Sequence, residues 1–199
     1  MKKYRLALIA ALAALAVSAS GCSFVTVVPI GQEGEYTGQK KFDSSEESSS
    51  DWDQVVDEIT QQASDVVEVL NAGGAVSEAA SVTGTAKIAA YDGAKSKKYL
   101  VLELDGYTGD AAVLIQIGGP NSTTAIRDVQ TLKNFENFTN QTEWSQYAKA
   151  LNKESASNVA EPLALDESCA GKTVTFTGAA VKSGTSTDII ITPVSLNVE

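Results

Sequence analysis

The amino-acid sequence predicts a mostly β domain with two helices (α+β), in which five strands form an OB-like barrel. The prediction rests on the order of the expected elements: three strands, a helix and two more strands, as in the OB-fold. Gly84 and Gly178 lie inside the first and fourth strands, where a tightly coiled barrel needs a bend or a bulge. An open antiparallel sheet covered by two helices is the alternative, because it would give much the same pattern.

An amphipathic helix is expected before the first strand. Apolar residues recur at steps of three and four from Trp52 to Leu70, and Gly73 follows as a helix stop. Asn140 and Glu143 are spaced as the N-cap and third-position partner of a second helix. The strands are rich in apolar and β-branched residues, are bounded by turn residues, and are expected at 82–91, 98–105, 111–117, 172–181 and 188–198.

The first 21 residues have the pattern of a lipoprotein signal peptide. Three basic residues precede an apolar run at 6–17 that is too short to span a bilayer, and small residues lead to Cys22. We expect cleavage before Cys22 and lipidation of its thiol, so that acyl chains hold the protein on a membrane. The expected location is therefore extracytoplasmic, on the periplasmic face of the cell envelope or at the cell surface.

Residues 22–50 are expected to join the lipid to a single globular domain at 51–199. The β-branched run at 24–30 predicts a short strand near the anchor. The stretch at 31–50 ends in a run of serine and acidic residues that cannot bury enough apolar surface to order itself. We therefore predict a flexible, Ser/Glu-rich linker there.

Charge and cysteine content exclude several classes of protein. Without the signal, 12 of the 15 basic residues remain against 25 acidic ones, a formal charge of −13 that disfavours nucleic acid as a partner. Cys169 is the one cysteine left beside Cys22, so an intramolecular disulfide framework is excluded, and we interpret Cys169 as a small buried residue.

The sequence contains no histidine, which excludes Ser-His and Cys-His nucleophile systems and imidazole acid–base chemistry. We expect no catalytic residue, no cofactor and no metal ion. Asp105 and Asp110 flank a turn that lacks the alternating oxygen ligands and distal acid of a calcium loop, so we interpret them as hairpin-turn residues.

Polar residues near the second helix form the candidate ligand site. Arg127 offers a planar fork for a carboxylate or a pair of sugar hydroxyls, and a helix start favours polar ligands. The site would comprise Arg127, Asp128, Asn140, Gln141 and Glu143. In the alternative interpretation Arg127 pairs with Asp128 or Glu143, and Asn140 only caps the helix. The nearby aromatic residues could stack on a sugar but are more typical of a core: Phe135, Phe138, Trp144 and Tyr147.

Several short segments are similar to the sequence pattern of a known protein family. They are 21–25, 27–30, 115–118, 124–128, 135–141 with Glu143, 171–174 and 191–194. On these segments the chain resembles the predicted periplasmic lipoproteins of unknown function (DUF2291), which are often encoded beside simple-sugar ABC transporters. It departs from the family's pattern where Gly119 separates Gly118 from Pro120. The resemblance implies an envelope location and a transporter neighbourhood, and it implies no reaction.

Two function hypotheses follow from these observations. The first is a non-enzymatic, lipid-anchored accessory domain that contacts an envelope protein, such as a component of an ABC-type sugar transport system. The second is a binding module for a sugar or another small polar solute.

Overall fold

The computed structural model describes residues 42–75, 77–94, 96–184 and 186–199. The predicted signal peptide, Cys22, the strand expected at 24–30 and the linker up to residue 41 lie outside these residues. The segment Asp43–Glu199 forms one compact unit. None of the helices that the structure describes is both long and apolar enough to traverse a bilayer.

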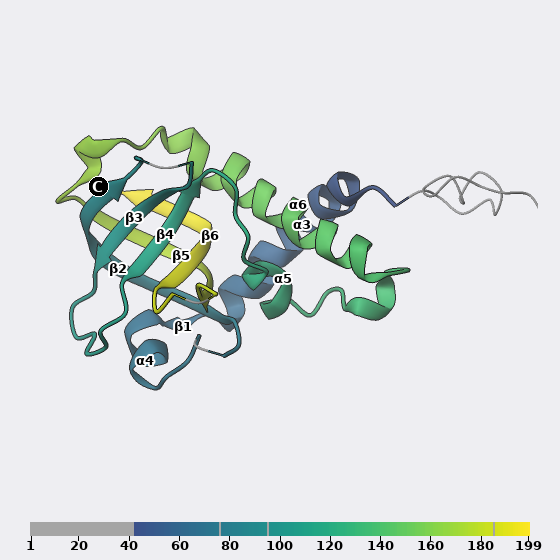
Figure 1. The fold of residues 1–199 in the computed structure, drawn as a ribbon, viewed down its shortest axis with the longest axis horizontal. Coiled ribbons are helices and arrows are strands. Elements are labelled where there is room, and N and C mark those ends of the chain that lie inside the picture. Colours follow the sequence, from purple (N-terminus) through teal and green to yellow (C-terminus); the bar gives the residue numbers. More distant parts are fainter. Residues whose placement is uncertain (1–41, 76, 95, 185) are drawn as a thin grey trace, which may run out of the picture. The chain divides into compact units, whose positions relative to one another are not determined.

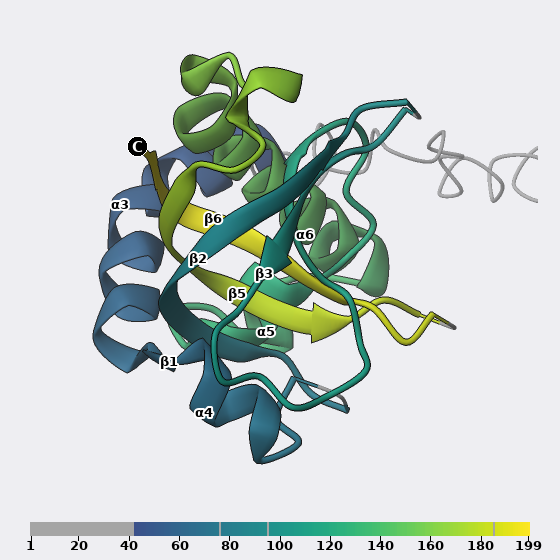
Figure 2. The same ribbon diagram turned by 90° about the vertical axis from the view of Figure 1, so that its left-hand side faces the viewer.

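This unit contains a closed barrel with helices beside it (Figures 1 and 2). Its strands lie in the order β2-β3-β4-β6-β5, and β5 pairs again with β2. The neighbours are antiparallel except for β4 and β6, which run parallel. The strands are β2 (Ala80–Asp92), β3 (Lys98–Glu103), β4 (Val113–Gly118), β5 (Thr173–Lys182) and β6 (Ile189–Val198). The predicted OB-like fold is confirmed, and the open-sheet alternative is wrong.

The barrel closes because β2 is long enough to pair with two strands, β5 and β3. Its first part, residues 80–87, pairs with β5, and its last part, residues 87–92, pairs with β3. The register shifts next to Gly178, where an added Cβ would lie 2.5 Å from the Thr192 carbonyl oxygen. In β2 the shift falls between Ile88 and Ala90 and not at Gly84, the position that the sequence suggested. Gly84 is needed for close packing instead, since its Cβ would lie 2.7 Å from Val66 Cγ1.

Apolar side chains of every barrel strand fill its interior. Those at most 1% exposed include Val82, Ile88, Leu100, Ile115, Val174, Phe176 and Ile191. Cys169 is 2% exposed and belongs to the same core, which confirms its interpretation as a buried residue.

The first described helix, α3 (Ser44–Gln62), begins earlier than predicted. The serine and acidic residues at 44–50, which we assigned to the flexible linker, form its first turns. The Asp43 carboxylate accepts hydrogen bonds from the backbone N–H groups of Ser45 and Glu46, at 2.9 and 3.2 Å. Ser48 is fully buried and donates to Glu154. Helix capping and contact with a distant helix therefore order a segment whose composition alone predicts a coil.

The helix predicted to reach Leu70 is interrupted after Gln62. Ser64–Asp65 form the short strand β1, which pairs parallel with β2 at Val82 and Thr83. Asp65 then caps α4 (Val66–Asn71), accepting from two backbone N–H groups. The predicted apolar stripe is still buried on both sides of the break, because α4 packs against the barrel that α3 also covers.

The connection between β4 and β5 contains the second predicted helix. It comprises α5 (Ala125–Val129), a 3₁₀ turn at Phe135–Asn137, α6 (Gln141–Ser155), a π-helical turn at Ala156–Ala160 and two further 3₁₀ turns at Glu161–Leu163 and Glu167–Cys169. Asn140 caps α6, as predicted. Helices α3, α5 and α6 lie together beside the barrel, whereas α4 lies near the end where the β3–β4 and β5–β6 loops meet (Figure 1).

Candidate functional site

The two charged residues predicted to bind a ligand, Arg127 and Asp128, pair with each other on α5. Arg127 Nε and Nη2 donate to Asp128 Oδ1 at 2.8 and 2.5 Å. The guanidinium carbon also lies 4.5 Å from the centre of the Trp144 ring, a cation–π distance. The Arg127 guanidinium, which could have bound a carboxylate ligand, is thus already bound to the carboxylate of Asp128.

Asn140, Gln141 and Glu143 lie at the start of α6. Asn140 Oδ1 accepts from the Glu143 backbone N–H at 3.0 Å, and Glu143 Oε2 accepts from the Thr139 backbone N–H at 2.9 Å. The Gln141 side chain is exposed and has no hydrogen bond within the described part of the chain. This arrangement agrees with the alternative interpretation of pairing and capping, and a ligand-binding role for these residues stays a prediction.

The neighbouring aromatic residues pack together as core. Phe138 lies 5.0 Å from Trp144 and 5.1 Å from Tyr147, measured between ring centres. Tyr147 is fully buried, and its hydroxyl donates to Asp51 Oδ2 at 2.8 Å. Lys133 forms ion pairs with Asp51, at 2.7 Å, and with Glu47. These contacts join α3 to α6, so we assign the aromatic cluster a structural role.

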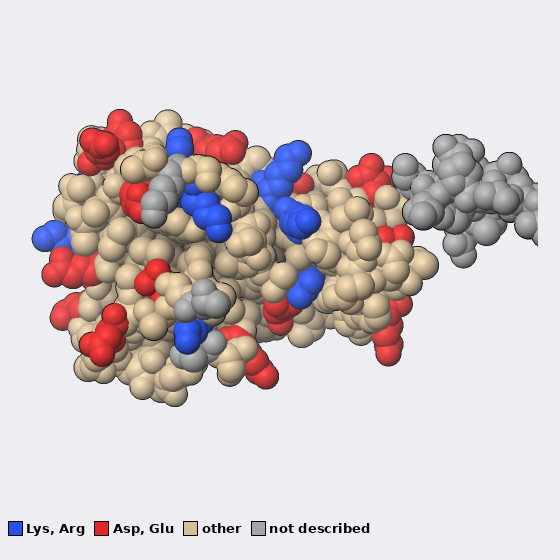
Figure 3. Space-filling model, viewed as in Figure 1, with Lys and Arg blue, Asp and Glu red and all other residues tan. Residues whose placement is uncertain are grey.

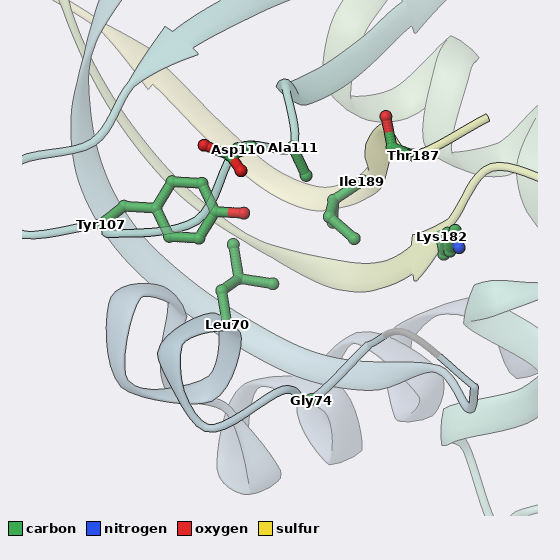
Figure 4. Close-up of a pocket in the computed structure, with 8 residues that line it drawn as sticks. All are labelled: Leu70, Gly74, Tyr107, Asp110, Ala111, Lys182, Thr187 and Ile189. Atoms are coloured by element: carbon green, nitrogen blue, oxygen red, sulfur yellow. The ribbon is translucent and has the colours of Figure 1, made fainter.

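A pocket of about 280 Å³ opens at one end of the barrel, and we call it the barrel-end pocket (Figure 4). Four separate segments supply its lining: α4 and the turn after it, the β3–β4 loop, the end of β5, and the start of β6 with the loop before it. The lining residues are Leu70, Gly74, Tyr107, Asp110, Ala111, Lys182, Thr187 and Ile189.

Hydrogen bonds fix the walls of this pocket. The Asn71 side chain of α4 donates to the Gly106 carbonyl at 2.9 Å and accepts from the Thr108 N–H at 3.0 Å, which holds the β3–β4 loop. Gly106 has a φ of +81°, a conformation that glycine adopts without strain. On the other side, the Lys182 N–H donates to the Ala75 carbonyl at 2.7 Å. The pocket is therefore formed by the fold itself.

The barrel-end pocket has an apolar floor and polar walls. Leu70 and Ile189 are 8% and 2% exposed, and their side chains point into the space shown in Figure 4. The Tyr107 hydroxyl points toward the same space. Asp110 and Lys182 have no side-chain hydrogen bond or ion pair to any other residue that the structure describes. Two opposite charges thus border an apolar surface and form no pair with the described part of the fold.

Sequence reasoning did not predict this pocket. Asp110 was correctly placed in the β3–β4 turn, but nothing along the chain connects that turn with Lys182 or Leu70. The available signal was the predicted barrel itself, because loops that leave the same end of a small barrel lie close together.

Charged residues elsewhere are spread over the surface. Figure 3 shows acidic side chains over both the barrel and the helical part of one face, with basic side chains between them. Within the described ranges, no group of three or more acidic or cysteine side chains could hold a metal ion.

The fold defines an OB-fold protein, with a pocket at one end of its barrel. A solved OB-fold protein from Thermotoga maritima is similar to this chain with a TM-score of 0.58 and 17% sequence identity, covering 80% of this chain and 100% of that chain. At this identity the likeness shows the fold alone. The chain belongs to the family described as predicted periplasmic lipoprotein (DUF2291), which matches residues 12–197. The family implies an envelope-associated, extracytoplasmic location. No curated protein matches the chain.

Proposed function

We propose that this chain is a lipid-anchored envelope protein without enzymatic activity, whose barrel binds a small polar solute in the barrel-end pocket. The observation that carries the proposal is a preformed pocket bordered by two charged side chains, Lys182 and Asp110, that the described fold leaves unpaired. Sites for small molecules are typically concave, mostly apolar and preformed, with a few polar groups that orient the ligand.

The predicted lipid anchor would determine where this pocket acts. A lipid on Cys22 would keep the domain beside a membrane, where a transporter of the ABC type takes up its solute. A solute held in the barrel-end pocket would then be close to the transport system. The envelope location of the family supports this role.

The chemistry of the pocket supports binding rather than catalysis. Among the described residues of its lining there is no cysteine, serine or histidine, and Asp110 is the single carboxylate. Glycoside hydrolysis without histidine requires two carboxylates on either side of the scissile bond. A binding site needs only that the fixed groups match the ligand.

Thermal unfolding of the purified chain with a panel of sugars, nucleosides, amino acids and small anions tests the proposal. A ligand at 100 times its dissociation constant adds about 2.7 kcal/mol, a shift of several degrees for a domain of this size. We expect a shift for one chemical class that disappears in Lys182→Met. No shift across the panel would contradict solute binding.

A docking role toward an envelope protein is the second candidate, and Phe135 favours it. This side chain is 47% exposed in the 3₁₀ turn between α5 and α6, three residues before Phe138 of the aromatic cluster. Exposed aromatic side chains are frequent anchors in protein interfaces. A photocrosslinker at position 135 in intact cells should capture a transporter component, whereas one at exposed Asp53 on α3 should not. Equal capture at both positions would contradict a docking site at Phe135.

A further inference from the structure

We infer that the ligand of the barrel-end pocket is a small zwitterion, such as an α-amino acid with a short apolar side chain. This inference rests on the proposed function, because it names the ligand class of the same pocket. Three features carry it: the two opposite charges, the apolar floor and the small volume.

The charges come from separate parts of the fold. Lys182 ends β5, whereas Asp110 lies on the β3–β4 loop, and the two are on different sides of the pocket in Figure 4. An anion would pair with Lys182 and leave Asp110 without a partner, and a cation would pair with Asp110 and leave Lys182 without one. A zwitterion matches both groups, with its carboxylate toward Lys182 and its ammonium toward Asp110.

The floor favours an aliphatic group over a sugar. Leu70, Ala111 and Ile189 offer carbon surface and no side-chain donor or acceptor. A sugar placed there would turn hydroxyl groups toward this surface without partners, which costs free energy. A short aliphatic side chain gains free energy by leaving water for the same surface.

The volume limits the size of the ligand. At about 280 Å³ the cavity lies below the roughly 300–1,000 Å³ of sites for drug-sized molecules. A small amino acid has few enough atoms for such a space. The Tyr107 hydroxyl, which points into the pocket, can donate to the ligand carboxylate or accept from its ammonium, a third polar contact besides Lys182 and Asp110.

Hydrogen bonds join the segments that form the walls of the pocket. Asn71 holds the loop that carries Tyr107 and Asp110, and the Ile189 N–H donates to the Ala112 carbonyl at 2.8 Å, which joins the starts of β6 and β4. Preformed geometry lowers the ordering cost of binding and strengthens discrimination between ligands.

Isothermal titration calorimetry of the full chain in detergent tests the inference. The probes are glycine, L-alanine, L-valine and L-leucine, together with isobutylamine and isobutyrate, which each carry one charge of valine on a similar carbon skeleton. We expect at least one amino acid to bind. Isobutylamine and isobutyrate, the two half-probes, should each bind at least about tenfold more weakly than valine, because each lacks one charge-assisted contact.

Charge variants assign the two contacts. Lys182→Met should weaken amino-acid binding about tenfold or more while leaving isobutylamine unchanged, and Asp110→Asn should weaken it similarly while leaving isobutyrate unchanged. Lys87→Met and Asp105→Asn are matched controls, since both residues are exposed and outside the pocket lining. Unfolding curves without ligand show that each variant is folded.

The outcomes separate the two proposals. Binding of a sugar or nucleoside that depends on Lys182 or Asp110, with no amino-acid binding, would overturn the zwitterion inference and keep the proposed solute-binding function. Half-probes that bind the native chain as tightly as valine would also overturn the inference. An absence of binding for every probe and every panel member would overturn both.

Discussion

Asn71 of α4 holds Thr108 of the β3–β4 loop through two hydrogen bonds. Its Oδ1 accepts from the Thr108 backbone N–H at 3.0 Å and from the Thr108 hydroxyl at 3.1 Å. The loop carries Tyr107 and Asp110, which line the barrel-end pocket. The geometry of the pocket therefore depends on a side chain that does not itself line it.

Replacement of Asn71 by alanine tests this dependence. We expect Asn71→Ala to lower the free energy of unfolding by about 1 kcal/mol, because the lost hydrogen bonds are exposed to water. Amide hydrogen exchange at Thr108 should become faster. Asn197→Ala is the control, since its amide reaches only Glu199 near the C-terminus. Unchanged exchange at Thr108 would show that the loop is held by other contacts.

Gly178 is required by the bulge between β5 and β6. An added Cβ would lie 2.5 Å from the Thr192 carbonyl oxygen and 2.9 Å from Pro193 Cα, both backbone atoms that cannot move independently. Gly178→Ala should therefore lower the free energy of unfolding by about 1–3 kcal/mol. Gly118→Ala is the control, because its nearest neighbour is the flexible Lys98 side chain at 3.3 Å. Urea unfolding that shows equal stability for both variants would contradict this role.

The barrel could be predicted from the sequence because its elements are local and ordered. The strand-forming runs and Asn140 as N-cap of α6 depend on neighbours along the chain, and the structure confirms them. The start of α3 was missed although Asp43 is a local N-cap, because the serine and acidic composition favoured a coil and the supporting contact of Ser48 is with Glu154, 106 positions away. The break before α4 likewise depends on pairing between β1 and β2.

The candidate site was harder to predict than the fold. Arg127 and Asp128 were correctly identified as a charged pair, but their contact uses the groups that a ligand would need. In the sequence, Lys182 is a basic residue at a strand end with no feature that indicates a site. Closure of the barrel places it at the same end as Leu70 and Asp110. A pocket assembled from four segments leaves no spacing pattern along the chain.

Arg127→Ala distinguishes the two candidate sites. The change removes the ion pair with Asp128 and the contact with Trp144, and should lower the free energy of unfolding by about 1–2 kcal/mol because Arg127 is only 13% exposed. Affinity for a ligand of the barrel-end pocket should stay unchanged. Lys149→Ala, at an exposed position of α6, is the stability control. Loss of solute affinity in Arg127→Ala would instead support the site predicted around α5 and α6.

Cys22→Ala tests the predicted lipid anchor. Without this thiol no diacylglyceryl group can be attached, so the protein should move from the membrane fraction to the soluble fraction of fractionated cells. Cys169→Ala is the matched control, because it removes the buried thiol and should leave the protein in the membrane fraction. Membrane retention of Cys22→Ala would show that another part of the chain holds the membrane.

Tyr147 should make stability depend on alkaline pH. Burial, followed by the hydrogen bond to Asp51 and its negative charge, raises the pKa of Tyr147 well above its ordinary value of 10.0. As pH rises past 10.0, the unfolded chain loses this proton while the folded chain keeps it. The stabilising effect of the protonated hydroxyl is therefore complete below the unfolded pKa and decreases above it.

In Tyr147→Phe this titration is absent. The variant should be less stable than the native protein by about 1 kcal/mol near neutral pH, because Asp51 loses a donor. The difference should then narrow as the pH is raised through about 10 to 11. Urea unfolding at a series of pH values measures both quantities. A difference that stays constant across the series would mean that Tyr147 titrates alike in the folded and unfolded states, and that its contact with Asp51 is not maintained in solution.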